Sequence, residues 1–201
     1  MKKLLIIIIL CVLLNAKNYA QSASTMKDKF LIGWEVAVPS NDLISGTSWS
    51  GGRFDYRHMI KPNLSVGVGV SWNSFSDYVS RTTYQKADGT GALTTDLVKD
   101  VYTVPITLET HYYFKGKKLL PYVGIGLGTE YSDQTLYFNI YSIEEDNWGF
   151  VARPEVGVIF PFNSGGTGLY LNGAYNYASN KNETFGTNSL SHFAVSLGFT
   201  F

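Results

Sequence analysis

Nine ionisable side chains stand at alternate positions within segments that are otherwise apolar or small. Arg53 and Arg57 flank Asp55 at a spacing of two, so in a strand all three side chains point to one face. Guanidinium groups placed in this way can clamp carboxylates from neighbouring strands through paired hydrogen bonds. The full candidate network comprises Glu35, Arg53, Asp55, Arg57, Glu109, His111, Glu130, Arg153 and Glu155.

Two kinds of chemistry fit such a network. Charges that line an open interior would form a gated ion path, whereas charges that neutralise one another would fill the interior with salt bridges. If the segments are strands that close into a narrow barrel, the second interpretation is favoured, because such a barrel has no room for a wide channel. Buried charges must also be paired to be tolerated.

The three histidines give little support to catalysis or metal binding. His58, His111 and His192 lie in different segments, without the close spacing of metal ligands, so we predict neither a metal nor another cofactor. Ser191 beside His192, with Glu183 upstream, could supply the serine, histidine and acid of a hydrolase. Such adjacency is common by chance, and we predict that the protein is not an enzyme.

The elements that must position these side chains have the pattern of strands. From Leu64 to Trp72 every second residue is apolar, and the residues between are serine or glycine. This is a period of two over about ten residues, the length of a tilted strand that spans a membrane. With seven further segments of the same kind, the candidate strands are residues 32–38, 53–60, 64–73, 106–114, 122–131, 148–160, 169–177 and 192–201.

The second face of these strands distinguishes lipid from water, since a soluble sheet alternates too. That face is mostly glycine, alanine, serine and asparagine with a few charges, which suits the cramped interior of a narrow barrel. Aromatic residues near the strand ends, such as Trp72 and Trp148 at one level and Phe160 and Phe199 at the other, fit interfacial girdles. We therefore predict an all-β fold, an eight-stranded antiparallel up-and-down transmembrane β-barrel. A soluble sandwich or lipocalin-like barrel is the alternative.

The connections alternate in length. Residues 61–63, 115–118 and 163–166 are short, whereas residues 39–49, 74–98, 132–147 and 179–189 are long. Short periplasmic turns opposite long outer loops are usual in such barrels, and an even strand number places both termini in the periplasm. Residues 74–98 form the largest predicted loop. Residues 135–143 also alternate and could extend a hairpin above the membrane, so ten strands is the second choice.

The N-terminus predicts export. Two lysines precede an apolar run from Leu4 to Leu14, and a polar stretch ends at Ala20. This is the pattern of a secretory signal peptide, and about 11 apolar residues are too few for a spanning helix. We predict a signal peptide at residues 1–20 and a barrel domain at residues 21–201. Cys11, the single cysteine, lies in the signal, so we expect no disulfide in the mature chain.

The chain resembles the family of small outer-membrane β-barrels that includes the barrel domain of outer membrane protein A and the OmpX and OmpW proteins. The resemblance is carried by the hairpin at residues 57–70, by Pro121-Tyr122-Val123-Gly124-Ile125-Gly126-Leu127-Gly128, and by the ending at residues 195–201. That ending looks like the signal read by the barrel-assembly machinery, with Val195, Leu197, Phe199 and Phe201 as its alternating apolar residues. The resemblance covers a barrel alone, so we do not expect wall anchoring.

The resemblance implies a place, the bacterial outer membrane, more than a function. We expect a non-enzymatic barrel with an envelope-structural or surface-interaction role through its external loops. The alternative is a passive channel for small or apolar solutes, as in OmpW-like proteins, and a lipid A-modifying enzyme is less favoured. The expected partners are outer-membrane lipid, lipopolysaccharide and the barrel-assembly machinery, with the protein as a monomer and its external partner unknown.

The net charge of the mature chain gives no reason to expect a nucleic-acid partner. Removal of residues 1–20 takes three of the 16 lysines and arginines and none of the 16 acidic residues, which leaves a net charge of about −3. We therefore expect no nucleic-acid partner.

Overall fold

The computed structural model describes residues 27–41, 43–85, 89–116, 119–162 and 166–201. The predicted signal peptide lies outside these residues. The described chain forms eight strands, which are β1 (Asp28–Pro39), β2 (Ser48–Lys61), β3 (Leu64–Gln85), β4 (Ala92–Tyr113), β5 (Leu120–Phe138), β6 (Tyr141–Pro161), β7 (Gly168–Ala178) and β8 (His192–Thr200). No helix in this part of the chain is long and apolar enough to cross a membrane.

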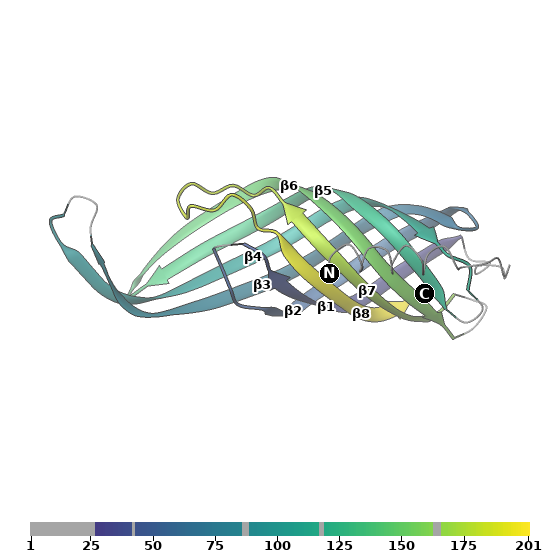
Figure 1. Ribbon diagram of the computed structural model, residues 1–201, viewed down its shortest axis with the longest axis horizontal. Helices are drawn as coiled ribbons and strands as arrows, with labels where there is room; N and C mark the ends of the chain where they lie inside the picture. Colours follow the sequence, from purple (N-terminus) through teal and green to yellow (C-terminus); the bar gives the residue numbers. More distant parts are fainter. Residues whose placement is uncertain (1–26, 42, 86–88, 117–118, 163–165) are drawn as a thin grey trace, which may run out of the picture.

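The strands close into a ring (Figure 1). Each strand pairs antiparallel with the next, and β1 pairs with β8 from Leu31 opposite Thr200 to Pro39 opposite His192. The predicted eight-stranded up-and-down barrel is therefore confirmed. The ten-stranded alternative is wrong for the described residues, because the alternating stretch after Tyr131 lengthens two strands instead of adding two.

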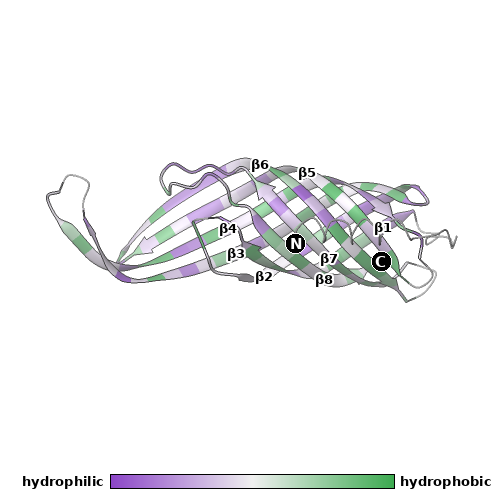
Figure 2. Cartoon of the chain, in the orientation of Figure 1, coloured by the Kyte–Doolittle hydropathy of each residue, from purple (hydrophilic) through white to green (hydrophobic). Residues whose placement is uncertain are grey.

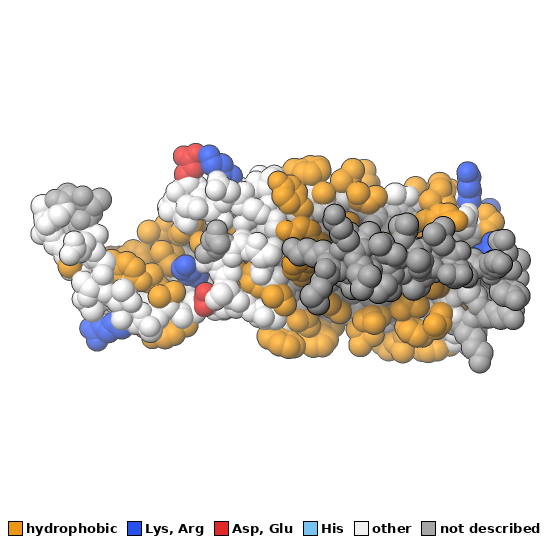
Figure 3. All heavy atoms as spheres, in the orientation of Figure 1, with side chains coloured by type: hydrophobic (Ala, Val, Ile, Leu, Met, Phe, Trp, Pro, Cys, Tyr) orange, Lys and Arg blue, Asp and Glu red, His pale blue; other side chains and the backbone are white. Residues whose placement is uncertain are grey.

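The side chains face opposite ways from those of a soluble barrel. On β8, Phe193, Val195 and Leu197 are each more than half exposed, whereas Ser196 and Thr200 between and beyond them are fully buried. Apolar side chains thus cover much of the described outer face of the barrel (Figure 3), and hydrophobic and hydrophilic residues alternate along its strands (Figure 2). Polar side chains fill the interior. This arrangement is favourable when the outer surface meets lipid, where the closed ring also satisfies the backbone hydrogen bonds.

Four strands continue beyond the ring. The β3–β4 and β5–β6 hairpins project past the ends of their neighbours (Figure 1), and β5 and β6 remain paired as far as Phe138 opposite Tyr141. The extension of a hairpin by residues 135–143 is thus confirmed. The prediction of a loop at residues 74–98 is wrong, since β3 runs to Gln85 and β4 begins at Ala92. Both faces of this hairpin are largely exposed, so its sequence lacks the apolar stripe that marks a spanning strand.

Two apolar clusters lie inside the barrel, one at each end. The turn-end cluster lies near the short connections and contains Leu31, Tyr113, Tyr122, Ile159 and Tyr170. The loop-end cluster lies near the long connections and contains Ala37, Leu43, Ile44, Phe75, Val101, Ala178, Leu190 and Ala194. The polar middle of the interior, called the lumen below, lies between the two clusters.

Candidate functional site

β2 brings three of the predicted charged residues into the lumen. Its backbone alternates Arg53, Asp55 and Arg57, all buried, with outward side chains such as Phe54. The neighbouring strand β3 has Gly69 opposite Asp55. A Cβ at Gly69 would overlap the carboxylate of Glu109 and contact Asp55, so the glycine makes room for the charged groups.

These side chains meet carboxylates from three strands. Arg53 Nε lies 2.7 Å from Asp55 Oδ1, and Arg57 Nη2 lies 2.7 Å from Asp55 Oδ2. Arg53 Nη2 also lies 3.0 Å from Glu109 Oε1 on β4 and 2.8 Å from Glu155 Oε2 on β6. Arg57 Nη2 reaches the second oxygen of Glu155 at 3.2 Å. The two guanidinium groups therefore share three buried carboxylates.

A second group joins β1 to β6. Arg153 Nη2 lies 2.6 Å from Glu35 Oε2, and both side chains are buried. Three neutral residues add hydrogen bonds to this pair. Asn73 Nδ2 donates to Glu35 Oε1 at 2.9 Å, Ser196 Oγ donates to Glu35 Oε2 at 2.7 Å, and Arg153 Nη1 donates to Asn176 Oδ1 at 3.0 Å. Sequence reasoning missed these three, whose only signal was a polar side chain at an inward position.

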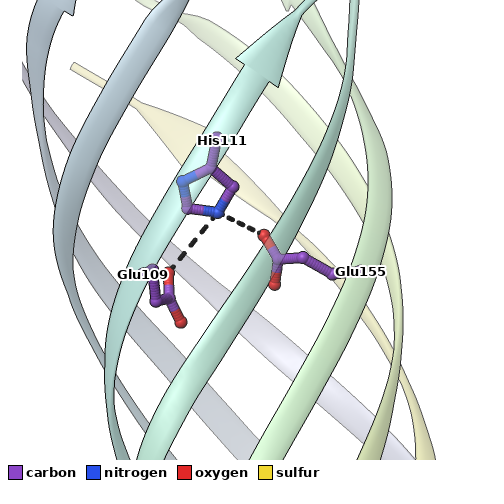
Figure 4. Close-up of side chains that lie close together, drawn as sticks. All are labelled: Glu109, His111 and Glu155. Carbon is purple, nitrogen blue, oxygen red and sulfur yellow. Dashed lines mark hydrogen bonds and ion pairs between the residues drawn. The ribbon is translucent and has the colours of Figure 1, made fainter.

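His111 lies between two carboxylates of the network (Figure 4). Its Nε2 is 2.6 Å from Glu155 Oε1 and 3.5 Å from Glu109 Oε2. The donor atoms of the three residues lie within 4.8 Å of one another, close enough to hold one metal ion. However, both carboxylates already bind Arg53, and a divalent cation would face that fixed positive charge at close range. The donor set therefore favours a hydrogen-bonded ion network over a metal centre.

His111 also completes an order of groups known from hydrolases. Ser65 Oγ lies 3.5 Å from His111 Nδ1, and Glu155 lies on the other side of the ring. Ser65 and His111 have no exposed surface. A substrate therefore has no path to the serine hydroxyl while the lumen keeps this packing, and the arrangement is structural.

The predicted rim residues are not brought together. His192 Nε2 accepts from Asn176 Nδ2 at 2.7 Å, and its Nδ1 donates to the carbonyl of Leu190 at 3.2 Å. Glu183 instead pairs with Lys181 on the exposed surface. Within the described residues, Ser191, His192 and Glu183 therefore form no catalytic relay.

Glu130 of β5 is buried but stands apart from the ion pairs. Neither of its carboxylate oxygens has a hydrogen-bond partner among the described residues. Of the nine predicted network residues, it is the one that the structure does not bring into contact with another. The predicted assembly residues Val195, Leu197, Phe199 and Phe201 all lie on or just after β8 and are about half exposed on the outer surface.

The sequence matches one family model over almost its whole length. The model describes the outer membrane protein beta-barrel domain and matches residues 6–201. The chain belongs to this family. Its closed ring and outward apolar surface are those of a bacterial outer-membrane β-barrel, and the resemblance noted from the sequence is confirmed.

Solved structures share the fold at low sequence identity. Neisserial surface protein A is 15% identical, with 87% of this chain and 96% of that chain covered and a TM-score of 0.56. Ail, the attachment invasion locus protein of Yersinia pestis, is 13% identical, with 88% of this chain and 100% of that chain covered and a TM-score of 0.49. The N-terminal barrel of Pseudomonas aeruginosa OprF is 13% identical, with 88% of this chain and 98% of that chain covered and a TM-score of 0.47.

Enzymes also occur among the matches. The outer membrane protease OmpT from Escherichia coli and the outer membrane enzyme PagL match with TM-scores of 0.47 and 0.35. No curated protein matches the chain in sequence.

Proposed function

We propose that the protein is a non-enzymatic, non-conducting outer-membrane barrel that contacts its surroundings through its long hairpins. The observation that carries this proposal is the filled lumen. Three buried arginines and the carboxylates that bind them occupy its middle, and an apolar cluster lies at each end. An eight-stranded barrel is just wide enough for side chains to fill in this way.

The hairpins supply the surface for contact. Beyond the ring, Tyr78, Ile140 and Tyr141 are all more than 60% exposed. They lie on the β3–β4 and β5–β6 hairpins, which project farthest from the barrel (Figure 1). Such side chains gain free energy when another molecule covers them, which supports a surface-interaction role.

Conductance tests the closed lumen against the alternative of a passive channel. The refolded protein in a planar bilayer is expected to give no large, steady single-channel current, and vesicles containing it are expected to take up apolar solutes no faster than empty vesicles. A steady current or accelerated uptake would favour the channel.

The non-enzymatic part of the proposal has its own test. Overexpression in a Gram-negative host is expected to leave the mass spectrum of lipid A unchanged, because the Ser65 hydroxyl is buried and the rim residues form no relay. A new deacylated or acylated lipid A species would assign the protein to the lipid A-modifying enzymes instead.

A further inference from the structure

The loop end of the lumen contains buried oxygen atoms that lack hydrogen-bond partners. Among the described residues these include both carboxylate oxygens of Glu130, the hydroxyl of Thr103 and the side-chain carbonyl of Asn180. None of the three residues has any exposed surface. A buried polar atom without a partner is costly, so several at one place indicate that a ligand satisfies them.

The strand register places these residues around one small region. Thr103 of β4 pairs with Ser132 of β5, and Glu130 precedes Ser132 by two positions, which puts it on the same inward face. Asn180 Nδ2 donates to Ser132 Oγ at 3.1 Å and to the backbone carbonyl of Glu130 at 3.1 Å. Thr103, Glu130 and Asn180 therefore all border Ser132.

A glycine leaves room for the Asn180 amide. Gly149 of β6 pairs with Glu130, and a Cβ at this position would overlap Asn180 Oδ1. The amide nitrogen of Asn180 faces three oxygens, the third being Asn147 Oδ1 at 2.9 Å. The amide oxygen is thereby left free above Gly149, beside the strand position of Glu130.

The charges of the lumen indicate the sign of the ligand. Its described acidic side chains are Glu35, Asp55, Glu109, Glu130 and Glu155. All of them except Glu130 form an ion pair with at least one of Arg53, Arg57 and Arg153. Glu130 has no ion pair in this part of the chain. A buried carboxylate without an ion-pair partner is strongly disfavoured, so a cation is the fitting ligand.

We propose that Glu130, Thr103 and Asn180 form a binding site for a hard cation, Na⁺ or Ca²⁺. Carboxylate, hydroxyl and amide oxygens are donors that such cations prefer. Because Asn180 lies in the connection between β7 and β8, the bound cation ties that connection to β4 and β5. Cation binding thereby stabilises the end of the barrel that carries the long hairpins.

Thermal unfolding in defined salts tests the site. The protein is refolded into phosphatidylcholine nanodiscs, which carry no anionic lipid, and unfolded with choline chloride, NaCl or CaCl₂ at one ionic strength. At about 100 times Kd, the effective cation is expected to raise Tm on the order of 5 °C. Titration calorimetry with each salt gives Kd and shows whether Na⁺ or Ca²⁺ is the ligand.

Variants decide whether Glu130 is responsible. Glu130→Gln is expected to abolish the rise in Tm, whereas Glu183→Gln, a matched change at an exposed carboxylate, is expected to keep it. No rise in the wild-type protein, or an equal rise in Glu130→Gln, would overturn the proposal and leave Glu130 with a proton.

A milder variant covers the case in which Glu130→Gln does not fold. Thr103→Val removes one neutral oxygen and keeps the volume of the side chain. It is expected to weaken the cation Kd several-fold in a barrel that still folds. An unchanged Kd in Thr103→Val would contradict the assigned site.

Discussion

Glu35 of β1 and Arg153 of β6 are joined across the lumen by an ion pair of 2.6 Å, although 118 residues separate them in the chain. The two strands share no backbone hydrogen bonds, since each pairs only with its neighbours in the ring. The ion pair therefore links walls of the barrel that the sheet itself leaves unlinked.

Arg153→Met should lower the free energy of unfolding by about 3–5 kcal/mol, because it leaves the buried Glu35 without its ion-pair partner. Urea-dependent unfolding of the refolded protein, followed by gel migration, measures the change. The double variant Glu35→Gln, Arg153→Met is the control and should regain part of the loss. A single variant as stable as the wild type would mean that the pair contributes nothing to stability.

Arg57→Ala should destabilise the barrel without opening a pore. The substitution removes contacts with Asp55 and Glu155, but Arg53 still binds both, and the apolar clusters still close both ends. Urea midpoints and planar-bilayer recordings test the two parts. Arg81→Ala, at an exposed position on β3, serves as the matched control and should change neither. A large steady current from Arg57→Ala would show that this one side chain blocks the lumen.

Two glycine-to-alanine variants should change the free energy of unfolding by different amounts or in opposite directions. At Gly69 a Cβ would overlap the Glu109 carboxylate, so Gly69→Ala should lower stability. At Gly173 the nearest atom to a new Cβ, the carbonyl oxygen of Val156, is 4.0 Å away, and Gly173→Ala should be neutral or slightly stabilising. Equal effects in urea unfolding would argue against a tightly packed lumen.

Shortening the β3–β4 hairpin should leave the barrel folded. Val79 pairs with Leu97, so replacing residues 80–96 with Asn-Gly closes the hairpin with a two-residue turn at that pair. The lumen network lies entirely on the retained residues, and the variant should keep its heat-modifiable migration. Loss of the folded band would mean that the hairpin contributes to assembly as well as to the outer surface.

Much of the fold could be predicted because lipid requires a regular pattern. All eight spanning strands were found from outward apolar residues at a period of two, as in the run from Leu64 to Trp72. The extension of β3 to Gln85 was missed, since both of its faces are exposed from Ser80 onward and water on both faces imposes no such pattern. Its strand conformation depends on pairing with β4, which is a property of the hairpin as a whole.

The sequence predicts which charged residues line the lumen, but not which of them pair with one another. The alternation of inward and outward side chains identifies both Arg53 and Glu130 as inward residues, yet of these two only Arg53 has ion-pair partners in the described chain. Which carboxylate meets which guanidinium depends on the stagger of each strand against the next. That stagger, which brings Glu155 of β6 to Arg57 of β2, is not encoded in any local spacing.

The seam between β1 and β8 bears on how the protein reaches its final state. Glu35 lies on the first strand, but its carboxylate accepts hydrogen bonds from Arg153 of β6 and from Ser196 of β8, the last strand. Until the last strand docks on the first, water can hydrate each of these groups separately. Sealing the seam exchanges that hydration for direct contacts all at once. An intermediate with an open seam therefore lacks the hydrogen bond between Ser196 and Glu35, although its pairs on β2, β4 and β6 can already form. Closure of the β1–β8 seam should therefore be abrupt.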